Sequence, residues 1–322
     1  MIDLLRIGPA AILLAAGSPA LSQAPYPSKP VRIVVPAAPG GGTDILARVL
    51  AQKFSESLGK QFLVENRPGA GQIVGTESVA RASPDGYTLL MAASPIATNQ
   101  VLYPKIPYDT LRDFAPIAKC ATVPNMLVVH PSVPAKSLKE LIALARSRPG
   151  ELTYASAGIG TSPHLSMELF RSMARVKLIH VAYKGTGIAI VDVLAGQVQL
   201  MSMNLLTGAT HVKSGRLRAL GVTSAQRAAM FPAVPTIAEA GVPGYEAISW
   251  YGLLAPAGTP RAVIDRVHAE AAKALQSSEV KERLTADGAE PSVSRPEEFA
   301  AFIRSEVVKW AKVVKDSGIT AE

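Results

Sequence analysis

Two glycine-containing turns are the parts of this chain whose residue types and spacing best suit the binding of a ligand. The apolar run 31–35 leads into the sequence GGGTD, residues 40–44, and then into a helical pattern. A second apolar run leads into SAGIGT, residues 156–161, and another helical pattern. Glycine lets the backbone turn its N–H groups inward, and the first amides of a helix have no partner within it. Each turn therefore suits an anion, although one such turn alone can equally be a plain connection.

The repetition of the turn in both halves of the chain favours ligand binding over a plain connection. Two such turns facing each other across a cleft could hold a carboxylate with backbone amides from both sides. Each hydrogen bond to a charged group contributes about 1.5–3 kcal/mol, and a helix N-terminus adds about 0.3–1 kcal/mol. Three or four such bonds reach the roughly 8 kcal/mol of a micromolar complex, so no arginine is required.

A third strand-to-helix junction, AYKGTG at residues 182–187, could add Tyr183 and Lys184 to the same site. Two alternatives stay open at this point. Tyr183 could instead be an aromatic cover over the core, and Lys184 could be an ordinary surface cation.

Enzyme and metal-site motifs are absent or incomplete in the sequence. Residues 57–60 match S-x-x-K, but they close a helix, and neither S-D-N nor K-T-G accompanies them. The glycine pairs lack the third glycine of a dinucleotide fingerprint, and there is no G-x-S-x-G. The five histidines are too far apart to indicate a metal site, and Cys120 is the only cysteine. His164 begins a helical pattern, which favours a local hydrogen bond. We expect no catalytic residue, no metal and no cofactor.

Strands alternate with helices along the whole chain, a pattern typical of α/β folds with parallel sheets. The pattern occurs as two series joined by two extended crossovers, at 125–131 and 247–256, and these predict a hinge between two lobes. Trp250 and Tyr251 lie in the second crossover, where a core position is more typical than ligand contact. Ligands of α/β proteins bind beyond the carboxyl ends of the strands, which here is the cleft. The predicted division is a signal peptide at 1–24, lobe one at 25–130, lobe two at 131–247, and the return crossover with the C-terminal helices of lobe one at 248–322.

Composition indicates an exported, soluble protein. Of the 322 residues, 48% are hydrophobic and 18% charged, which excludes disorder as the main state. The apolar run AAILLAAGSPALSQA, residues 10–24, is typical of a secretory signal peptide, with a buried N-terminal helix as the alternative. The net charge of +8 is scattered and aromatic residues make up 5%, so the sequence does not suggest a nucleic-acid partner.

The motifs of the mature chain closely resemble those of the Bug family, the periplasmic substrate-binding proteins of tripartite tricarboxylate transporters. The resemblance runs from about Tyr26 to the end of the chain. It implies a two-lobe periplasmic-binding-protein fold, type II-like, that closes on a small carboxylate held largely by backbone amides and waters. The matching motifs, in chain order, are VRIVVPAAPGGGTDILAR, ENRPGAG, SPDGYTLL, YASAGIGTSPHLSMELF, AYKGTG, LAGQVQLM, GRLRALGVTS, FPAVPTIAEAGVPGYE and WYGLLAPAGTP.

The same resemblance implies which residues bind the carboxylate. They belong to the first glycine turn, to the second one, and to the loop after the strand TLLMAA. The charge of Asp44 would repel a carboxylate, so we expect Asp44 to offer its backbone N–H and to brace the turn. The predicted ligand-binding residues, including the two from the third junction, are Gly41, Gly42, Thr43, Asp44, Ser94, Ser156, Ala157, Gly158, Gly160, Thr161, Tyr183 and Lys184.

Three positions depart from the pattern of the family. Gln199 and Met203 stand where relatives often have Asp, and Ile96 stands where many have His. If these positions face the cleft, the pocket is less acidic and more apolar than in relatives that bind amino acids. We then expect a carboxylate without an amine to bind more tightly than aspartate or glutamate.

The sequence therefore predicts a non-enzymatic periplasmic receptor, monomeric, that delivers a small carboxylate to the membrane subunits of a tripartite tricarboxylate-type transporter. Two alternatives use the same cleft. One is a secreted α/β hydrolase or lyase, and the other is a module that senses the ligand for a kinase.

Overall fold

The computed structural model describes residues 26–183, 185–286 and 288–317, so the predicted signal peptide and Lys184 lie outside the described residues. The described strands are β1 (Val31–Val35), β2 (Phe62–Asn66), β3 (Thr88–Ala93), β4 (Phe114–Val129), β5 (Thr153–Ser156), β6 (Ile179–Ala182), β7 (Leu200–Asn204), β8 (Arg218–Val222), β9 (Ile248–Pro256) and β10 (Glu290–Pro291). The described helices are α1 (Gly42–Leu58), the 3-10 helix η1 (Ala70–Gln72), α2 (Ile73–Ala80), α3 (Pro95–Leu102), α4 (Leu138–Ser147), α5 (Ser162–Ala174), α6 (Thr186–Leu194), α7 (Leu205–Lys213), α8 (Arg261–Gln276), α9 (Ser278–Ala286) and α10 (Pro296–Ser317).

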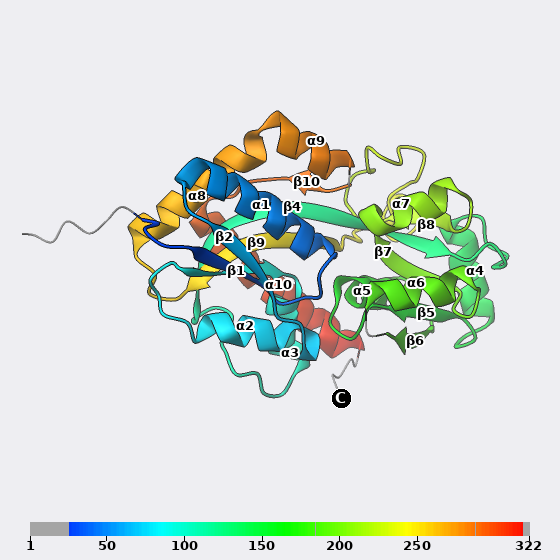
Figure 1. Cartoon of the computed structure of the whole chain (residues 1–322). Helices are drawn as coiled ribbons and strands as arrows, with labels where there is room; N and C mark the ends of the chain where they lie inside the picture. The colour runs from blue at the N-terminus through cyan, green and yellow to red at the C-terminus, as the bar shows by residue number, and fades with distance from the viewer. Residues whose placement is uncertain (1–25, 184, 287, 318–322) are drawn as a thin grey trace, which may run out of the picture.

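The strands pair in the order β2-β1-β3-β9-β4-β7-β5-β6, with β8 and β10 also paired to β4. Along β4 the partner changes at Pro124 and Asn125. Residues up to Pro124 pair with β9, and residues from Asn125 onward pair with β7 and β8. The two halves of the sheet, with their helices, form two lobes joined by β4 and β9, as Figure 1 shows. The predicted α/β two-lobe fold is confirmed. The residue numbers of the lobe boundaries stay a prediction.

Strand directions place the predicted turns opposite one another. In lobe one, β1, β2 and β3 run in the same direction as β4, because β3 and β4 are both antiparallel to β9. In lobe two, β5, β6 and β7 run against β4. Since β4 runs from lobe one to lobe two, the carboxyl ends of both sets of strands point toward the gap between the lobes. The helices α1, α3, α5, α6 and α7 begin at these ends (Figure 1).

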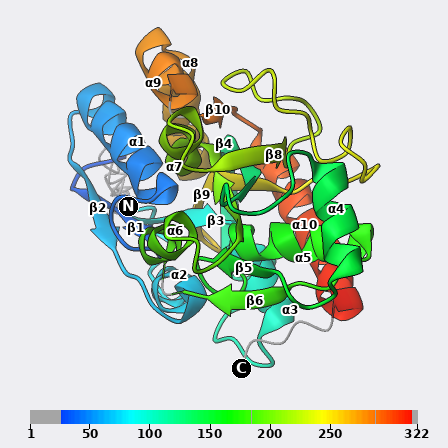
Figure 2. The ribbon, with the colours of Figure 1, turned by 90° about the vertical axis from the view of Figure 1, so that its right-hand side faces the viewer.

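Each lobe has its own apolar core on the faces of its half of the sheet. In lobe one, buried residues of α1, α8 and α9 cover one face, and those of α2, α3 and the first half of α10 cover the other. In lobe two, α4 and α5 lie on one face and α6 and α7 on the other (Figure 2). Parallel strands that are buried on both faces explain why their sequences are apolar without alternation.

Helix α10 differs from the expectation that the C-terminal helices pack only on lobe one. Its first half places Phe299 and Ile303 in the core of lobe one. Its second half places Trp310 and Val313 in the core of lobe two, beside α5. A helix of 22 residues is about 33 Å long, long enough to cross from one lobe to the other.

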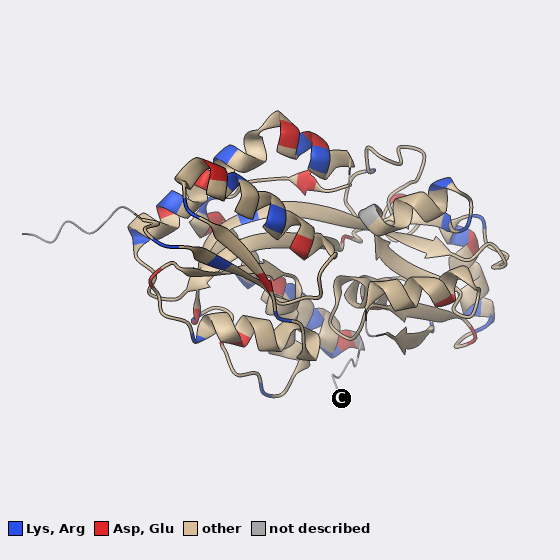
Figure 3. Ribbon diagram, in the orientation of Figure 1, with Lys and Arg blue, Asp and Glu red and all other residues tan. Residues whose placement is uncertain are grey.

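Charged residues of both signs are interspersed over both lobes, as Figure 3 shows. Within the described ranges, none of the helices combines the length and the apolar character needed to cross a membrane.

Candidate ligand-binding site

The first glycine turn ends in an uncapped helix. Gly40 has a φ of +84°, and Gly41 precedes α1 in an extended conformation without a side-chain hydrogen bond to the helix. The amides of Gly42, Thr43 and Asp44 are the first three of α1. Among the described residues, none of these three amides has an acceptor. A helix N-terminus with free N–H groups attracts an anion through both the hydrogen bonds and the helix dipole.

Asp44 braces this turn, as expected. Its carboxylate accepts hydrogen bonds from the Gly40 amide at 2.9 Å, from Arg48 Nε at 3.0 Å and from Asn66 Nδ2 at 3.0 Å. Burial raises the pKa of Asp44, but these hydrogen bonds outweigh it and hold the pKa below its usual value. The negative charge is therefore neutralised by Arg48 and turned into the loop, which leaves the helix amides as the exposed polar groups.

Tyr251 of β9 lies against the start of α1. Its hydroxyl oxygen is only 2.5 Å from the position that a Cβ on Gly42 would occupy. The side chain is nine-tenths buried, and in the described part of the chain its hydroxyl has no hydrogen-bond partner. Burial raises the pKa of Tyr251 to about 12, so the hydroxyl keeps its proton at neutral pH. A cavity of about 20 Å³, room for one water, is lined by Gly42, Tyr251 and Asn204 of β7, so lobe two also borders this point.

The second glycine turn is held mainly by its own side chains. Ser156 is fully buried, and its hydroxyl bonds to His180 Nε2 at 2.7 Å and accepts the Gly158 amide at 3.1 Å. The Thr161 hydroxyl donates to the Gly158 carbonyl at 2.6 Å. The Gly160 amide donates to His164 Nδ1 at 3.1 Å, so the local hydrogen bond expected for His164 is confirmed.

These bonds decide which amides of the second turn remain for a ligand. Gly158 and Gly160 have φ values of +128° and +77°, so glycine is needed there for backbone conformation. Their amides already have acceptors within the protein. The amides of Ala157, Ile159 and Ser162 have none among the described residues. Ile159 and Ser162 were not among the ligand-binding residues predicted from the sequence. Ser162 could have been, because it is the first residue of α5 and the first amides of a helix have no partner within it.

Helix α3 supplies one hydrogen bond between the lobes and one within lobe one. The Thr98 hydroxyl donates to the Gly160 carbonyl at 3.3 Å. Asn99 donates to the Gly71 carbonyl at 2.8 Å, while its Oδ1 is buried without a partner among the described residues. Thr98 and Asn99 were not predicted. Ser94, which was predicted, is buried and starts α3 by accepting the Ala97 amide on its carbonyl.

At the third junction, the Tyr183 hydroxyl donates to Asp192 of α6 at 2.6 Å. The hydroxyl is therefore engaged within lobe two. Ligand contact by Tyr183 and Lys184 stays a prediction, as it does for the predicted residues of both glycine turns.

The assumption that Gln199, Met203 and Ile96 face the cleft was wrong. Ile96 packs in the core of lobe one, and Met203 is fully buried in the core of lobe two. Gln199 lies at the amino end of β7, away from the gap, where its Oε1 accepts the amide and hydroxyl hydrogens of Thr153. Alternation along a strand cannot show from the sequence alone which face is covered by a helix. None of these three side chains therefore makes the pocket less acidic.

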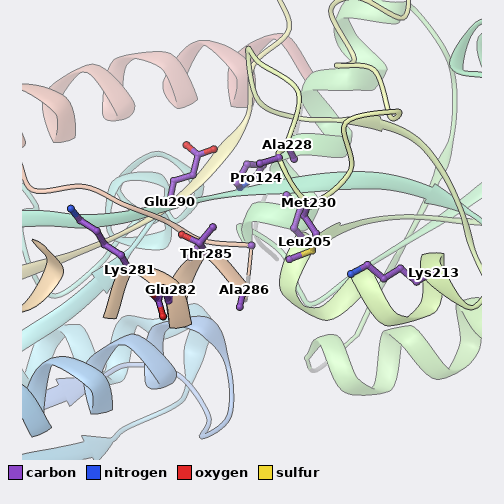
Figure 4. A pocket seen from close by; sticks show the side chains of 13 residues that line it. Pro124, Leu205, Lys213, Ala228, Met230, Lys281, Glu282, Thr285, Ala286 and Glu290 are labelled. Atoms are coloured by element: carbon purple, nitrogen blue, oxygen red, sulfur yellow. The ribbon is translucent and has the colours of Figure 1, made fainter. Parts of the chain in front are cut away.

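A larger groove of about 630 Å³ lies between the lobes at the side of α9 and α7 (Figure 4). None of the predicted site residues lines it. Its lining is mostly small and apolar, and its charges balance, since Lys213 and Lys281 are accompanied by Glu282 and Glu290. Because these charges balance, the groove has no net positive charge to attract an anion.

One pair of side chains resembles the nucleophile and base of a hydrolase. Ser156 and His180 bond as a nucleophile and its base would. Ser156 has no exposed surface, however, so a substrate cannot reach its hydroxyl. Within the described residues there is also no group of three or more side chains able to hold a metal ion.

Comparison with known proteins agrees with this geometry. Residues 46–319 match the family model described as tripartite tricarboxylate transporter family receptor. The chain belongs to this receptor family. It is 41% identical to BugT of Bordetella pertussis, over 91% of this chain and 90% of that protein. It also resembles an R. palustris protein solved with adipate, with a TM-score of 0.86, 38% identity and coverage of 92% and 99% of the two chains. MatC from Rhodopseudomonas palustris, solved with bound malate, gives a TM-score of 0.81, 34% identity and coverage of 90% and 100%.

Membership of the family answers two of the questions raised by the sequence. Receptors of this family are solute-binding proteins and not enzymes, so the hydrolase or lyase alternative is wrong. They are also periplasmic, in agreement with the expected export of the chain.

Proposed function

We propose that this tripartite tricarboxylate transporter receptor binds a small dicarboxylate between its lobes. One carboxylate lies on the free amides of α1 and on the Tyr251 hydroxyl, and the other end points toward the start of α5. The observation that carries the proposal is the uncapped N-terminus of α1 beside a nine-tenths buried, unpartnered hydroxyl. The adipate and malate found in the two similar structures support a dicarboxylate as the class of ligand.

The number of donors is sufficient for micromolar binding. The amides of Gly42, Thr43 and Asp44 and the Tyr251 hydroxyl offer four hydrogen bonds to one carboxylate. At about 1.5–3 kcal/mol for each hydrogen bond to a charged group, four bonds give about 6–12 kcal/mol before the costs of ordering. A micromolar complex needs about 8 kcal/mol.

Lobe two supplies the second set of donors in this proposal. The free amides of Ala157, Ile159 and Ser162 face the far end of the ligand, directly or through waters. The Thr98–Gly160 hydrogen bond and the ligand then hold the same pair of lobes together. Closure on the ligand produces the form that the membrane subunits of the transporter accept. The protein acts as an exported monomer.

The test is a thermal-shift and calorimetry series with the mature protein. Succinate, malate, glutarate and adipate are compared with the monocarboxylate butyrate. We expect at least one dicarboxylate to bind with micromolar or lower Kd and to be recovered with unchanged mass. If no dicarboxylate raised the melting temperature at millimolar concentration, the proposal would be wrong.

Tyr251→Phe separates the proposed donor from general packing. We expect about a tenfold loss of affinity for the bound dicarboxylate, because one hydrogen bond to a charged group is lost. Tyr108→Phe is the matched control. Tyr108 is also buried in lobe one, but in the core on the other face of the sheet from Tyr251, so removal of its hydroxyl should leave affinity unchanged.

A further inference from the structure

Two histidines of lobe two, one buried and one partly buried, stack behind the second glycine turn. The rings of His164, in the first turn of α5, and His180, in β6, have centroids 4.2 Å apart and planes inclined by 23°. The ring of Tyr154 lies beside this pair, with its centroid 4.8 Å from that of His180 and 6.5 Å from that of His164. His164 is only 2% exposed.

Each imidazole holds one end of the turn. His164 Nδ1 accepts the Gly160 amide at 3.1 Å, and His180 Nε2 bonds to the Ser156 hydroxyl at 2.7 Å. Gly160 is also the residue whose carbonyl accepts the Thr98 hydroxyl from lobe one. The histidine pair therefore fixes both the shape of the turn and its contact with the opposite lobe.

We propose that His164 and His180 are positioning residues for the second glycine turn, and that His164 performs this role only as a neutral imidazole. Acid then releases the turn and weakens ligand binding. This inference rests on the proposed function, because it assumes that the turn forms part of the ligand site.

The chemistry of the two bonds explains why His164 is the sensitive member. An imidazole nitrogen that accepts an amide hydrogen carries no proton of its own. Protonation would set an N–H of His164 against the N–H of Gly160. The bond of His180 is different, because the Ser156 hydroxyl can either donate to Nε2 or accept from it. Protonated His180 can therefore keep its hydrogen bond with the Ser156 hydroxyl, whereas protonated His164 loses its hydrogen bond with the Gly160 amide.

Burial, and to a lesser extent nearby charges, keeps both rings neutral at pH 7. Burial first, and then the charge of Arg171, lower the pKa of His164 to about 4. Burial and the charges of His164 and Arg171 lower the pKa of His180 to about 4, against an opposing effect of Glu168. Arg171 and Glu168 pair on α5, and the Tyr154 hydroxyl of β5 donates to Glu168. Among the described residues, no charged group of β7, β9 or α10 shifts either pKa, although these elements also pack against α5.

The first experiment needs no ligand. Hydrogen exchange of the Gly160 amide is measured at pH 7 in the wild type, His164→Ala and His164→Asn. We expect at least tenfold faster exchange in His164→Ala, because the acceptor is lost, and near-normal exchange in His164→Asn, whose side-chain oxygen can accept the amide. Unchanged exchange in His164→Ala would overturn the inference, even if the wild type bound no carboxylate.

The second experiment measures the adipate Kd between pH 4 and 7 in the same variants. Comparison at equal pH cancels the protonation of adipate itself. We expect His164→Ala to bind at least tenfold more weakly at pH 7, and His164→Asn to bind within about threefold of the wild type there. Toward pH 4 the affinity of the wild type should fall relative to that of His164→Asn, because asparagine does not gain a proton in this range. His268→Asn, in lobe one, is the control whose profile should follow the wild type. Parallel profiles of the wild type and His164→Asn would refute the acid release.

Discussion

The hydroxyl oxygen of Tyr251 occupies the space beside Gly42, 2.5 Å from where a Cβ on that glycine would stand. In the sequence analysis, the role given to glycine in this turn is to let the backbone direct its N–H groups inward. The contact gives a different reason, because it is the tyrosine of the hinge strand that excludes a side chain at this position. Ser249, two residues earlier on the same face of β9, bonds to the Ser162 hydroxyl at 2.6 Å. One strand therefore touches the start of α1 and the start of α5.

We expect Gly42→Ala to weaken dicarboxylate binding at least tenfold, because the new methyl group displaces Tyr251 and with it the proposed donor. Calorimetry with adipate measures the effect. Gly187→Ala is the control, since a Cβ there meets no atom within 4 Å and the glycine has no positive φ. Equal affinity in Gly42→Ala and the wild type would count against a site at α1.

Gly160→Ala should impair closure of the lobes. Gly160 has a φ of +77°, and a Cβ would lie 2.8 Å from Leu102 Cδ1 in the opposite lobe. We expect adipate to produce less compaction in small-angle scattering than it does for the wild type, and affinity to fall at least tenfold. Leu102→Ala in the same chain should recover part of the loss, because it removes the clash across the gap but leaves the backbone strain. A fully compacting single variant would contradict the interlobe contact.

The buried carboxylate of Glu306 gives a prediction for stability. It accepts hydrogen bonds from Trp250 Nε1 at 3.1 Å and Trp310 Nε1 at 3.0 Å, one from the core of each lobe. Glu306→Leu leaves both indole N–H groups unpaired in the core, so we expect it to lower the free energy of unfolding by about 2–4 kcal/mol. Urea unfolding followed by tryptophan fluorescence measures the change, and exposed Glu282→Leu is the control. A loss below 0.5 kcal/mol would show that the network adds little.

Acid should reduce stability through the two stacked histidines. Their pKa values are about 4 in the folded protein and 6.5 ordinarily, so the unfolded chain binds more protons between these values. The contribution of the two neutral histidines to the free energy of unfolding is therefore fully present above pH 6.5. It falls as the pH decreases toward 4, and below that pH these groups cause no further loss. We expect the melting temperature of the wild type to fall more steeply over this range than that of the His164→Asn, His180→Asn double variant. Identical slopes would mean that the stack does not govern this loss.

The sequence predicted the fold well because the fold depends on local patterns. Apolar strand runs, a glycine at each turn and the order of strands and helices all act over a few residues. The bracing by Asp44 also followed from local chemistry, since a carboxylate in a helix's first turn would repel an anion unless it is turned inward.

What the sequence could not predict are the contacts between distant segments. Tyr251 is 209 positions from Gly42, and Thr98 is 62 positions from Gly160. The burial of Ile96 and Met203 depends on which face of the sheet each helix covers, and no local pattern specifies that.

The last prediction concerns an amine on the ligand. The original premise, which relied on Gln199, Met203 and Ile96, is wrong, but the described acidic side chains beside the turns lead to a similar expectation. Asp44 is paired with Arg48, and Asp192 accepts the hydroxyl of Tyr183. A buried ammonium group needs a carboxylate or several acceptors, but Arg48 already neutralises Asp44, and Asp192 is turned to Tyr183 within lobe two. We therefore expect adipate to bind at least tenfold more tightly than 2-aminoadipate in matched calorimetry. The candidate acceptor for an amine is the unpartnered Oδ1 of Asn99. Tighter binding of the amino acid, abolished by Asn99→Leu, would reverse the prediction and assign recognition of the amine to α3.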